Sequence, residues 1–460
     1  MYRHLVIVAV FLLLSGCTLT PDYERPALDV PESFVQPADG GASIANLEWW
    51  NLFRDAQLQY LIRTALAENR DLRAALQRIL EARALLTFTR ADQYPFIDGS
   101  GSVSRERPSR ILFPGSDTGN NYTLSADLSF EVDLWGKLRR ATEAAQSDLL
   151  ATEAAYRNVT ISLVANVASV YFLLRDLDDR LQVSRDTVKS RTESLKIIQA
   201  RFDKGTVPEL DVNQAEIELA IAEAAVSAFE RETVQAENAL QFLLGRNPGP
   251  IQRGQPLKQQ VMPSDIPVGL PSELLQRRPD LVEAEERLIA ETARIGVAEA
   301  LRYPSIGLTG NLGLASDDFS DLTDSDAKTW SIASGLFAPI FNSGKLKARA
   351  EGQRARTEQV MAAYESALLQ AFREVEDSLI AIRTYNAEHA ARQRQATAAR
   401  NASRLSRARY DGGVVDYLEV LDSERSLFNA ELDESITLRQ YLNSIIELYK
   451  ALGGGWNPTG

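Results

Sequence analysis

The chain is a tandem duplication, and no other feature of its sequence constrains the fold as strongly. The segment that begins at Arg201 returns 208 residues later, at Arg409. Within residues 201–223, ten of the twenty-three positions are identical at this offset: Arg201, Asp203, Gly205, Val207, Leu210, Val212, Glu216, Leu219, Ala222 and Glu223. Self-similarity at a fixed offset marks a repeated structural unit. We therefore expect two copies of one supersecondary unit.

Breaks in composition bound the two repeats. The first repeat is predicted over residues 49–246 and the second over 272–454, each opening with short helices. Residues 247–271 are rich in proline and form the linker between them. Residues 455–460 form a C-terminal tail.

The N-terminus has the pattern of a secretory signal peptide over residues 1–16. A basic residue, Arg3, precedes a short apolar run and small residues. The run is too short to span a bilayer as a helix. Because no other apolar run has the length of a membrane helix, any further crossing of a membrane must use β-strands.

Cys17 is the only cysteine of the chain, and the residues before it, Leu14-Ser15-Gly16, resemble the lipobox of bacterial lipoproteins. That resemblance implies an S-diacylglycerol and N-acylated cysteine after cleavage. Two or more acyl chains on one residue give stable anchoring. Thr18 is not the aspartate that retains lipoproteins at the inner membrane, so the resemblance implies the outer membrane of a Gram-negative cell. Residues 17–48, interrupted by prolines, are predicted to be an extended tether.

A period-2 pattern predicts two β-hairpins, over residues 96–134 and 305–341. The clearest strand is Tyr122–Leu134, where apolar residues alternate with polar or acidic ones, including Asp127, Glu131 and Asp133. Its length suits the ~9–11 residues of a tilted transmembrane strand. A soluble sheet with one wet face gives the same alternation, so this pattern alone leaves both interpretations open.

Long helical hairpins are predicted over residues 136–245 and 344–454. No proline occurs from Gly136 to Asp203, and at ~1.5 Å per residue such a helix would reach about 100 Å. Apolar residues follow coiled-coil spacing, in the first helix at Val159, Leu163, Val167, Val170, Leu174, Leu177 and Leu181. The same spacing occurs in the second at Leu368, Phe372, Val375, Leu379 and Ile382.

Two hairpins supply four strands, which are too few to close a membrane barrel, since the smallest have eight. An open sheet edge in lipid is excluded because each unpaired backbone group there costs several kcal/mol. If the strands lie in a membrane, several chains must pool them.

The composition argues against catalysis and against binding of nucleic acid. Only two histidines occur, His4 within the signal peptide and His389, so no zinc site, Ser-His-Asp group or Cys-His couple can form. No nucleotide-binding or nucleophile motif occurs, and we expect no enzyme activity, cofactor or metal. A net charge of −13 opposes binding of nucleic acid. We expect His389 and most of the carboxylates to lie on solvated surfaces.

An acidic segment lies between the third and fourth predicted strands. It contains Asp317, Asp318, Asp321, Asp324 and Asp326. We expect a solvated loop outside the cell; bridging to lipopolysaccharide by divalent ions is the alternative.

With these features the mature chain resembles the TolC-type outer membrane factors, and specifically the lipidated branch that serves tripartite efflux systems of the RND type. The most specific parts of the resemblance are the lipobox at Cys17, the duplicated Arg-aromatic-Asp-x-Gly turns and the terminal segment Tyr449–Trp456. The resemblance implies a homotrimer with a twelve-stranded β-barrel in the outer membrane and a long α-helical coiled-coil tunnel in the periplasm.

The resemblance also implies partners and sites. An inner-membrane efflux pump loads the substrate, and a periplasmic adaptor (membrane fusion) protein docks on the two helical tips, Gly205-Thr206-Val207 and Gly413-Val414-Val415. A periplasmic gate is implied just after the second tip, at Leu418, Asp422 and Arg425, which share one helix face. The first repeat has Leu210, Gln214 and Ile217 at these positions, so only the second is expected to carry the gate. A solvated polar helix face is the alternative.

These observations predict a gated outer membrane exit duct for drugs or other small molecules, without catalysis or an energy source of its own. The alternative is a lipid-anchored periplasmic coiled-coil scaffold without a pore, in which the four strands form a small soluble sheet. The sequence does not name the substrates, the pump or the adaptor.

Overall fold

The structure is a computed structural model that describes residues 22–27, 30–35, 48–261, 268 and 271–454. It divides into two compact units, and each contains segments of both sequence repeats. Unit 1 comprises residues 1–27, 78–153 and 283–365, and unit 2 comprises residues 28–77, 154–282 and 366–460. Cys17, the signal peptide and the C-terminal tail lie outside the described residues.

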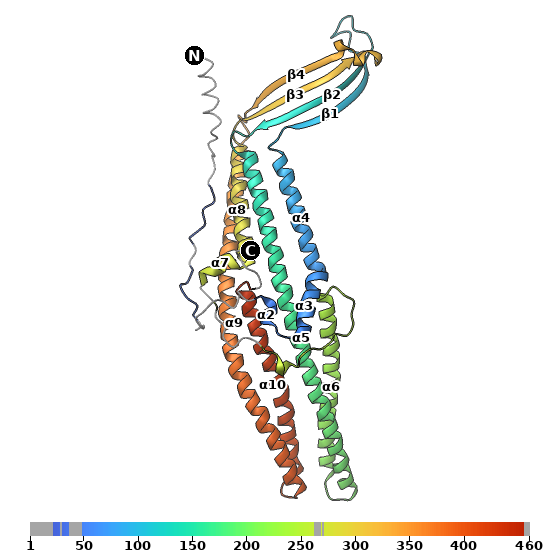
Figure 1. Cartoon of the computed structure of the whole chain (residues 1–460), viewed down its shortest axis with the longest axis vertical. Coiled ribbons are helices and arrows are strands. Elements are labelled where there is room, and N and C mark those ends of the chain that lie inside the picture. The colour runs from blue at the N-terminus through green and yellow to red at the C-terminus, as the bar shows by residue number, and fades with distance from the viewer. Residues whose placement is uncertain (1–21, 28–29, 36–47, 262–267, 269–270, 455–460) are drawn as a thin grey trace. The chain divides into compact units, whose positions relative to one another are not determined.

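Unit 1 contains a four-stranded antiparallel sheet in the order β1-β2-β3-β4 (Figure 1). The strands are β1 (Phe96–Glu106), β2 (Gly119–Val132), β3 (Ser305–Ser316) and β4 (Lys328–Phe337). Each predicted hairpin thus forms, and the hairpins join through β2 and β3. β1 and β4 are the two edges of the sheet.

The register of the strands sorts their side chains onto two chemically different faces. Directly opposed residues share a face, and Leu124 is opposed by Leu314, which is opposed by Lys328. The apolar face so defined contains Ile97, Val103, Tyr122, Leu124, Leu128, Phe130, Ile306, Leu308, Leu312, Leu314, Trp330, Ile332 and Leu336. The opposite face is polar, and side-chain hydrogen bonds cross it from Ser100 to Ser125 (2.9 Å) and from Ser102 to Thr123 (2.6 Å).

Four long helices are the longest elements of the fold, and the duplication gives them matched lengths. Helices α5 (Lys137–Asp203) and α9 (Lys345–Asp411) each have 67 residues. Helices α6 (Glu209–Leu243) and α10 (Tyr417–Ala451) each have 35. The shorter helices are α2 (Trp49–Leu52), α3 (Ala56–Glu68), α4 (Arg70–Ala91), α7 (Leu274–Arg277) and α8 (Pro279–Ala300), with short 3₁₀ turns at Leu257–Gln259, Pro271–Glu273, Ser320–Thr323 and Ser325–Ala327.

The long helices end in duplicated glycine caps. Gly205 ends α5 and Gly413 ends α9, with φ of 72° and 70°. In the second cap Gly413 N donates to Tyr410 O (2.9 Å) and Val414 N donates to Arg409 O (2.9 Å). This is the Schellman pattern, in which a residue of positive φ lets the last carbonyls find donors. A side chain at this φ would strain the backbone, which explains why the glycine occurs in both repeats.

The core of unit 2 forms where apolar seams of the long helices meet. The predicted seam of α5 is buried at Leu163, Val167, Leu174 and Leu177, and that of α9 at Leu368 and Val375. Among the described residues α5 is the one helix long and apolar enough to cross a membrane by length and composition, and half of that stretch is buried inside the chain. A core helix passes the same test, and the seam accounts for its apolar character.

Buried carboxylates depart from the prediction that acidic residues lie on solvated faces. Asp55 is 2% exposed and caps α3 by accepting from Gln57 N (2.8 Å). It also accepts from Tyr171 Oη (2.8 Å) and Gln260 Nε2 (2.8 Å). This one carboxylate therefore joins α3, α5 and the linker between the repeats. Burial raises its pKa, but the hydrogen bonds from Gln260 and Tyr171 outweigh burial and hold the pKa below its usual value.

Asp55→Ala should destabilise the protein by about 2–4 kcal/mol, because the buried donors lose their acceptor. Since the folded-state pKa is depressed, the stabilisation by Asp55 is present above the unfolded pKa and is lost as pH falls through the folded pKa. Thermal melting across acidic pH should show a flatter acid dependence for the variant. Glu223→Ala, at an exposed site on α6, is the control and should leave the melting curve unchanged.

Candidate functional site

The apolar face of the sheet has no covering element among the described residues. On β4, Trp330, Ile332 and Leu336 are 75%, 82% and 71% exposed. An apolar patch that extends across a whole sheet marks a surface that meets a membrane or a partner. The face is therefore built to lie against lipid or other apolar groups.

The polar face holds Asp127 in a hydrogen-bond network. Asp127 accepts from Asn311 Nδ2 (2.6 Å), Ser125 Oγ (2.9 Å) and Ser100 Oγ (3.1 Å). Two further acidic residues predicted for this face have other roles. β2 ends at Val132, and Asp133 instead accepts from Leu138 N and Arg139 N at the start of α5. Glu131 pairs with Lys137 at 2.6 Å. Orphan N–H groups at a helix start attract carboxylates, a use that strand periodicity does not reveal.

The two predicted docking tips are exposed turns of unit 2. Gly205 and Gly413 supply the positive φ of each turn, and the side chain of Val414 is 69% exposed. Behind the second tip the Tyr410 and Tyr417 rings lie 5.3 Å apart. The Arg201 guanidinium lies 4.8 Å from the centre of the Tyr410 ring. This cation–π contact links the α5 tip to the α9 tip.

The three predicted gate residues share an exposed concave surface of α10. Leu418, Asp422 and Arg425 line it together with Val415, Asp416 and Glu419. Leu418 is 60% exposed although it is large and apolar. Within the described part of the chain Asp422 makes no ion pair, whereas Glu419 pairs with Arg409 at 2.9 Å.

Arg425 connects this surface to the first helical hairpin. Its Nη2 donates to Glu218 Oε1 on α6 at 2.6 Å, and its Nε donates to the same atom at 3.0 Å. Glu218 is 3% exposed and also pairs with the buried Arg191 of α5. Arg191 donates to the Glu218 carbonyl oxygen and lies 5.3 Å from the centre of the Phe428 ring. Burial lowers the pKa of Arg191, and the Glu218 charge opposes this shift.

Sequence reasoning missed Glu218 and Arg191. An acidic residue at helical spacing has the signature of a solvated face, and its burial depends on a helix from the other repeat. The available signal was the difference between repeats: Arg425 stands where the first repeat has Ile217, and Glu218 where the second has Ser426.

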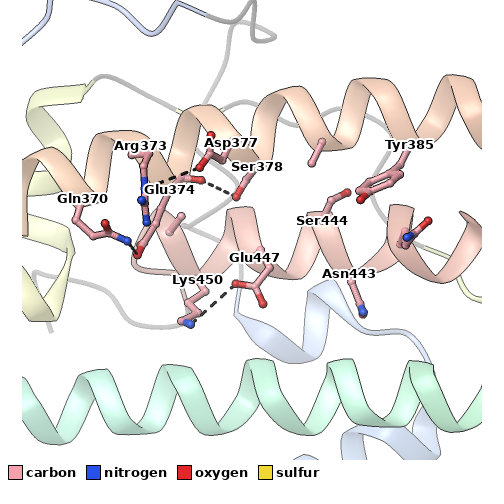
Figure 2. Close-up of a pocket in the computed structure, with 13 residues that line it drawn as sticks. Gln370, Arg373, Glu374, Asp377, Ser378, Tyr385, Asn443, Ser444, Glu447 and Lys450 are labelled. Carbon is pink, nitrogen blue, oxygen red and sulfur yellow. Dashed lines mark hydrogen bonds and ion pairs between the residues drawn. The ribbon is translucent and has the colours of Figure 1, made fainter.

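A polar groove of about 440 Å³ lies between α9 and α10 (Figure 2). Figure 2 shows Gln370 bound to Glu374 on α9 and Lys450 beside Glu447 on α10. Gln370 Nε2 donates to Glu374 Oε1 at 2.7 Å, and Lys450 Nζ lies 4.0 Å from Glu447 Oε2. The Asn443 Oδ1 atom is buried and has no hydrogen-bond partner within the described chain. Amides, carboxylates and ammonium groups line the groove, but it contains no histidine, cysteine or paired nucleophile and base.

His389 and the acidic loop complete the survey of candidate groups. His389 is half-buried rather than at the surface, its Nδ1 lacks a hydrogen-bond partner among the described groups, and burial lowers its pKa. The acidic loop folds into two 3₁₀ turns, and Asp318 accepts from Ser320 N at 3.0 Å. Over the described residues no group of three His, Cys, Asp or Glu side chains has the arrangement of a metal site.

Comparison with known proteins decides the family. The family model for "Outer membrane efflux protein" matches residues 61–246 and 270–454. The chain belongs to this family. It is 37% identical over 458 residues to the toluene efflux pump outer membrane protein TtgI of Pseudomonas putida, covering 97% of each chain. It is 36% identical over 453 residues to the cation efflux system protein CusC of Escherichia coli K12, covering 97% of this chain and 98% of the relative.

A solved structure agrees in fold. The open state of the MtrE outer membrane channel of Neisseria gonorrhoeae superposes with a TM-score of 0.87 at 32% identity, covering 95% of this chain and 98% of that one. The protein is thus an outer membrane channel component of an efflux pump, extends into the periplasm, and has no enzymatic role. This outcome confirms the predicted duct and excludes the scaffold without a pore.

If the apolar face meets lipid, Leu128→Arg should block assembly, because arginine near mid-membrane costs about 2–4 kcal/mol on the lipid side of a barrel. Ser129→Arg, at the adjacent position on the polar face, is the matched control. The yield of folded protein in purified outer membranes is the measurement. Equal yields from both variants would contradict the assignment of the faces.

Proposed function

We propose that three copies of this chain form the channel by pooling their strands into a twelve-stranded barrel. The support is the sheet itself: β1 and β4 have hydrogen-bonded neighbours on one side only in the described sheet. Three copies would join each β1 to the β4 of the next and leave no edge, as lipid requires. The polar face would then line the lumen and the apolar face would meet lipid.

We infer that Cys17 carries the lipid anchor. Asp22, five residues further on, bonds Arg140 at 2.5 Å, and α5 begins at Lys137, shortly after β2. An extended chain covers at most ~3.5 Å per residue, so Cys17 would lie within about 18 Å of this contact. Nearby, Arg25 donates to both Glu285 carboxylate oxygens at 2.6 Å, and Tyr23 Oη donates to Oε1 at 3.0 Å. These bonds fasten the tether to α5 and α8, and the Arg140 contact follows shortly after the end of β2, where a membrane surface would lie.

The periplasmic gate is proposed at Leu418, Asp422 and Arg425. Under threefold symmetry the exposed Leu418 side chains would form an apolar constriction, and three Asp422 carboxylates would form an acidic ring. Arg425 would hold α10 closed through its ion pair with Glu218. The single observation that carries this proposal is that pair, because it joins the two helical hairpins that would have to separate.

The partners follow from membership of an efflux system. The tips Gly205-Thr206-Val207 and Gly413-Val414-Val415 are proposed as the docking site of a periplasmic adaptor, with an inner-membrane pump as the source of substrate. The Arg201–Tyr410 contact would present both tips as one surface. TtgI is named for toluene efflux and CusC for cation efflux, at almost equal identity. We therefore propose small molecules or ions as cargo without assigning a class, since the pump selects it.

Single-channel conductance in planar bilayers tests the duct and the gate together. We expect a nearly closed wild type and a clearly more conductive Asp422→Ala, because the shorter alanine side chain would widen the constriction. Gln214→Ala is the control, since Gln214 is the equivalent residue of the first repeat. If wild type conducts and Asp422→Ala conducts no better, the gate is rejected and the duct is retained. If both proteins are folded and neither conducts, both are rejected.

Glu218→Gln should open the channel and also destabilise it. The change removes the charge shared by Arg191 and Arg425, and breaking a buried pair costs about 3–5 kcal/mol. We expect raised conductance together with a lower melting temperature. Glu216→Gln, at an exposed acid of the same helix, should change neither. A loss of stability without any rise in conductance would mean that the ion pair is structural only.

A further inference from the structure

Two cations occupy unusual positions on the lipid-facing side of the sheet. Arg105 lies near the end of β1 and Lys328 begins β4, both at the end of the sheet that carries the loops. Lys328 opposes Leu314, and Arg105 is two residues beyond Val103, which opposes Tyr122. By the alternation of strands, both therefore belong to the apolar face. Both are exposed and make no ion pair within the described chain.

In one chain these cations lie on opposite edges of the sheet, but barrel closure brings them together. This step rests on the trimer proposed above. Opposed residues must share a face, so the residue of the next copy that opposes Lys328 is restricted to odd-numbered positions of β1. Within one chain, Lys328 of β4 opposes Leu314 of β3, which opposes Leu124 of β2, which opposes Gly101 of β1. Lys328 and Gly101 therefore lie on the same line across the sheet. We define the offset as the number of residues from Gly101 to the β1 residue of the next copy that opposes Lys328. This offset must be an even number.

The strand tilt selects the offset. Four strands at ~4.8 Å span about 19 Å, and each residue rises ~3.3 Å. An offset of four residues gives a tilt of about 35° and an offset of six about 46°, close to the 35–45° of membrane barrels, whereas an offset of two gives only about 20°. Offsets in the opposite direction would leave most of both edges unpaired. An offset of four places Arg105 opposite Lys328, and an offset of six places Arg107 there, one residue beyond the end of β1.

In both allowed registers an arginine of one copy faces Lys328 of the next. Like charges directly opposed across two strands are destabilising unless an anion lies between them. The surrounding residues mark a membrane surface: the Tyr122 and Phe319 rings meet edge to face with their centres 5.7 Å apart, and Trp330 is exposed on the same face. Aromatic side chains of this kind gather at the level of lipid headgroups.

We propose that each of the three seams binds the phosphate of an outer-leaflet lipid, the phosphorylated lipid A of lipopolysaccharide, between Arg105 of one copy and Lys328 of the next. Arginine binds phosphate through paired N–H groups and lysine contributes a point charge. The site is incomplete in a single chain, so lipid binding would lock neighbouring copies together. The rival counter-anion is Asp326, two residues before Lys328, which would make the seam a contact between proteins alone.

The seam is tested first by a disulfide in the Arg105→Cys, Lys328→Cys double variant. Cys17 is the only natural cysteine, so no other thiol of the sequence competes once it is acylated. Cross-linked trimers on a denaturing gel would establish that the two positions meet. Failure to form any trimer would reject the proposed assembly itself. Trimers without a cross-link would reject only this register and the lipid site with it.

Lipid A binding is then measured through the melting temperature of detergent-solubilised trimer titrated with lipid A. We expect wild type to be stabilised, and Arg105→Gln and Lys328→Gln to need about tenfold more lipid A, the loss of one charge-assisted hydrogen bond each. Dephosphorylated lipid A should have no effect. Arg110→Gln is the matched control, because Arg110 lies in the loop that follows β1 but pairs with Asp117 at 2.7 Å.

The variant Asp326→Asn distinguishes the two candidate counter-anions, the lipid A phosphate and the Asp326 carboxylate, because they predict different changes in the melting temperature. If phosphate is the ligand, removal of a nearby carboxylate should strengthen the response to lipid A. If Asp326 is the counter-anion, the same change should lower the melting temperature of the lipid-free trimer, and lipid A should stabilise wild type no more than its dephosphorylated form does. That second result would overturn the proposal.

Discussion

Backbone groups of a strand inside a bilayer need hydrogen-bond partners, since an unpaired group there costs several kcal/mol. In the described sheet, β2 and β3 have hydrogen-bonded neighbours on both sides. β1 and β4 have a neighbour on one side only, so their outer edges must be paired by other copies. Much of the proposed assembly follows from this requirement. It requires several copies to pool their strands, and in the proposed trimer closure limits the register at the seams and brings Arg105 near Lys328.

The duplication supplies two nearly equivalent halves, and the proposed gate depends on how they differ. Both repeats retain the glycine-capped turns, because positive φ at Gly205 and Gly413 excludes ordinary side chains. At the gate the repeats have diverged in a complementary way. The first supplies Glu218 where the second has Ser426, and the second supplies Arg425 where the first has Ile217. The ion pair between the repeats therefore joins two residues that each occur in one repeat only.

Sequence periodicity was enough to predict the strands, the long helices and their apolar seams. Each of these elements is encoded by apolar residues that recur at one regular spacing within a short segment. The alternation from Tyr122 onward predicted the correct face for β2, and Leu163, Val167 and Leu174 are buried as expected. The failures involve groups whose environment is set by distant segments. Asp55 is buried by the inter-repeat linker, Glu218 by Arg191 and Arg425, and Asp133 is drawn to a helix start rather than the lumen.

The ion pairs that Glu218 makes with Arg191 and Arg425, which are proposed to hold the gate closed, are also weak. This suits a duct that has no energy source of its own. Burial opposes the charges of Arg191 and Glu218, and one contact between them, from Arg191 Nη2 to Glu218 Oε2 at 3.0 Å, lacks hydrogen-bond geometry. A buried pair of this kind contributes little net stability, although removing one partner is costly. Exchanging these contacts for others therefore costs little free energy.

To shift the ratio of closed to open channels from 99:1 to 1:99, a partner must bind the open state more tightly than the closed state by about 5.5 kcal/mol. If an adaptor docks at the nearby tips of each of the three copies, each contact would need to supply only one third of this free-energy preference for the open state.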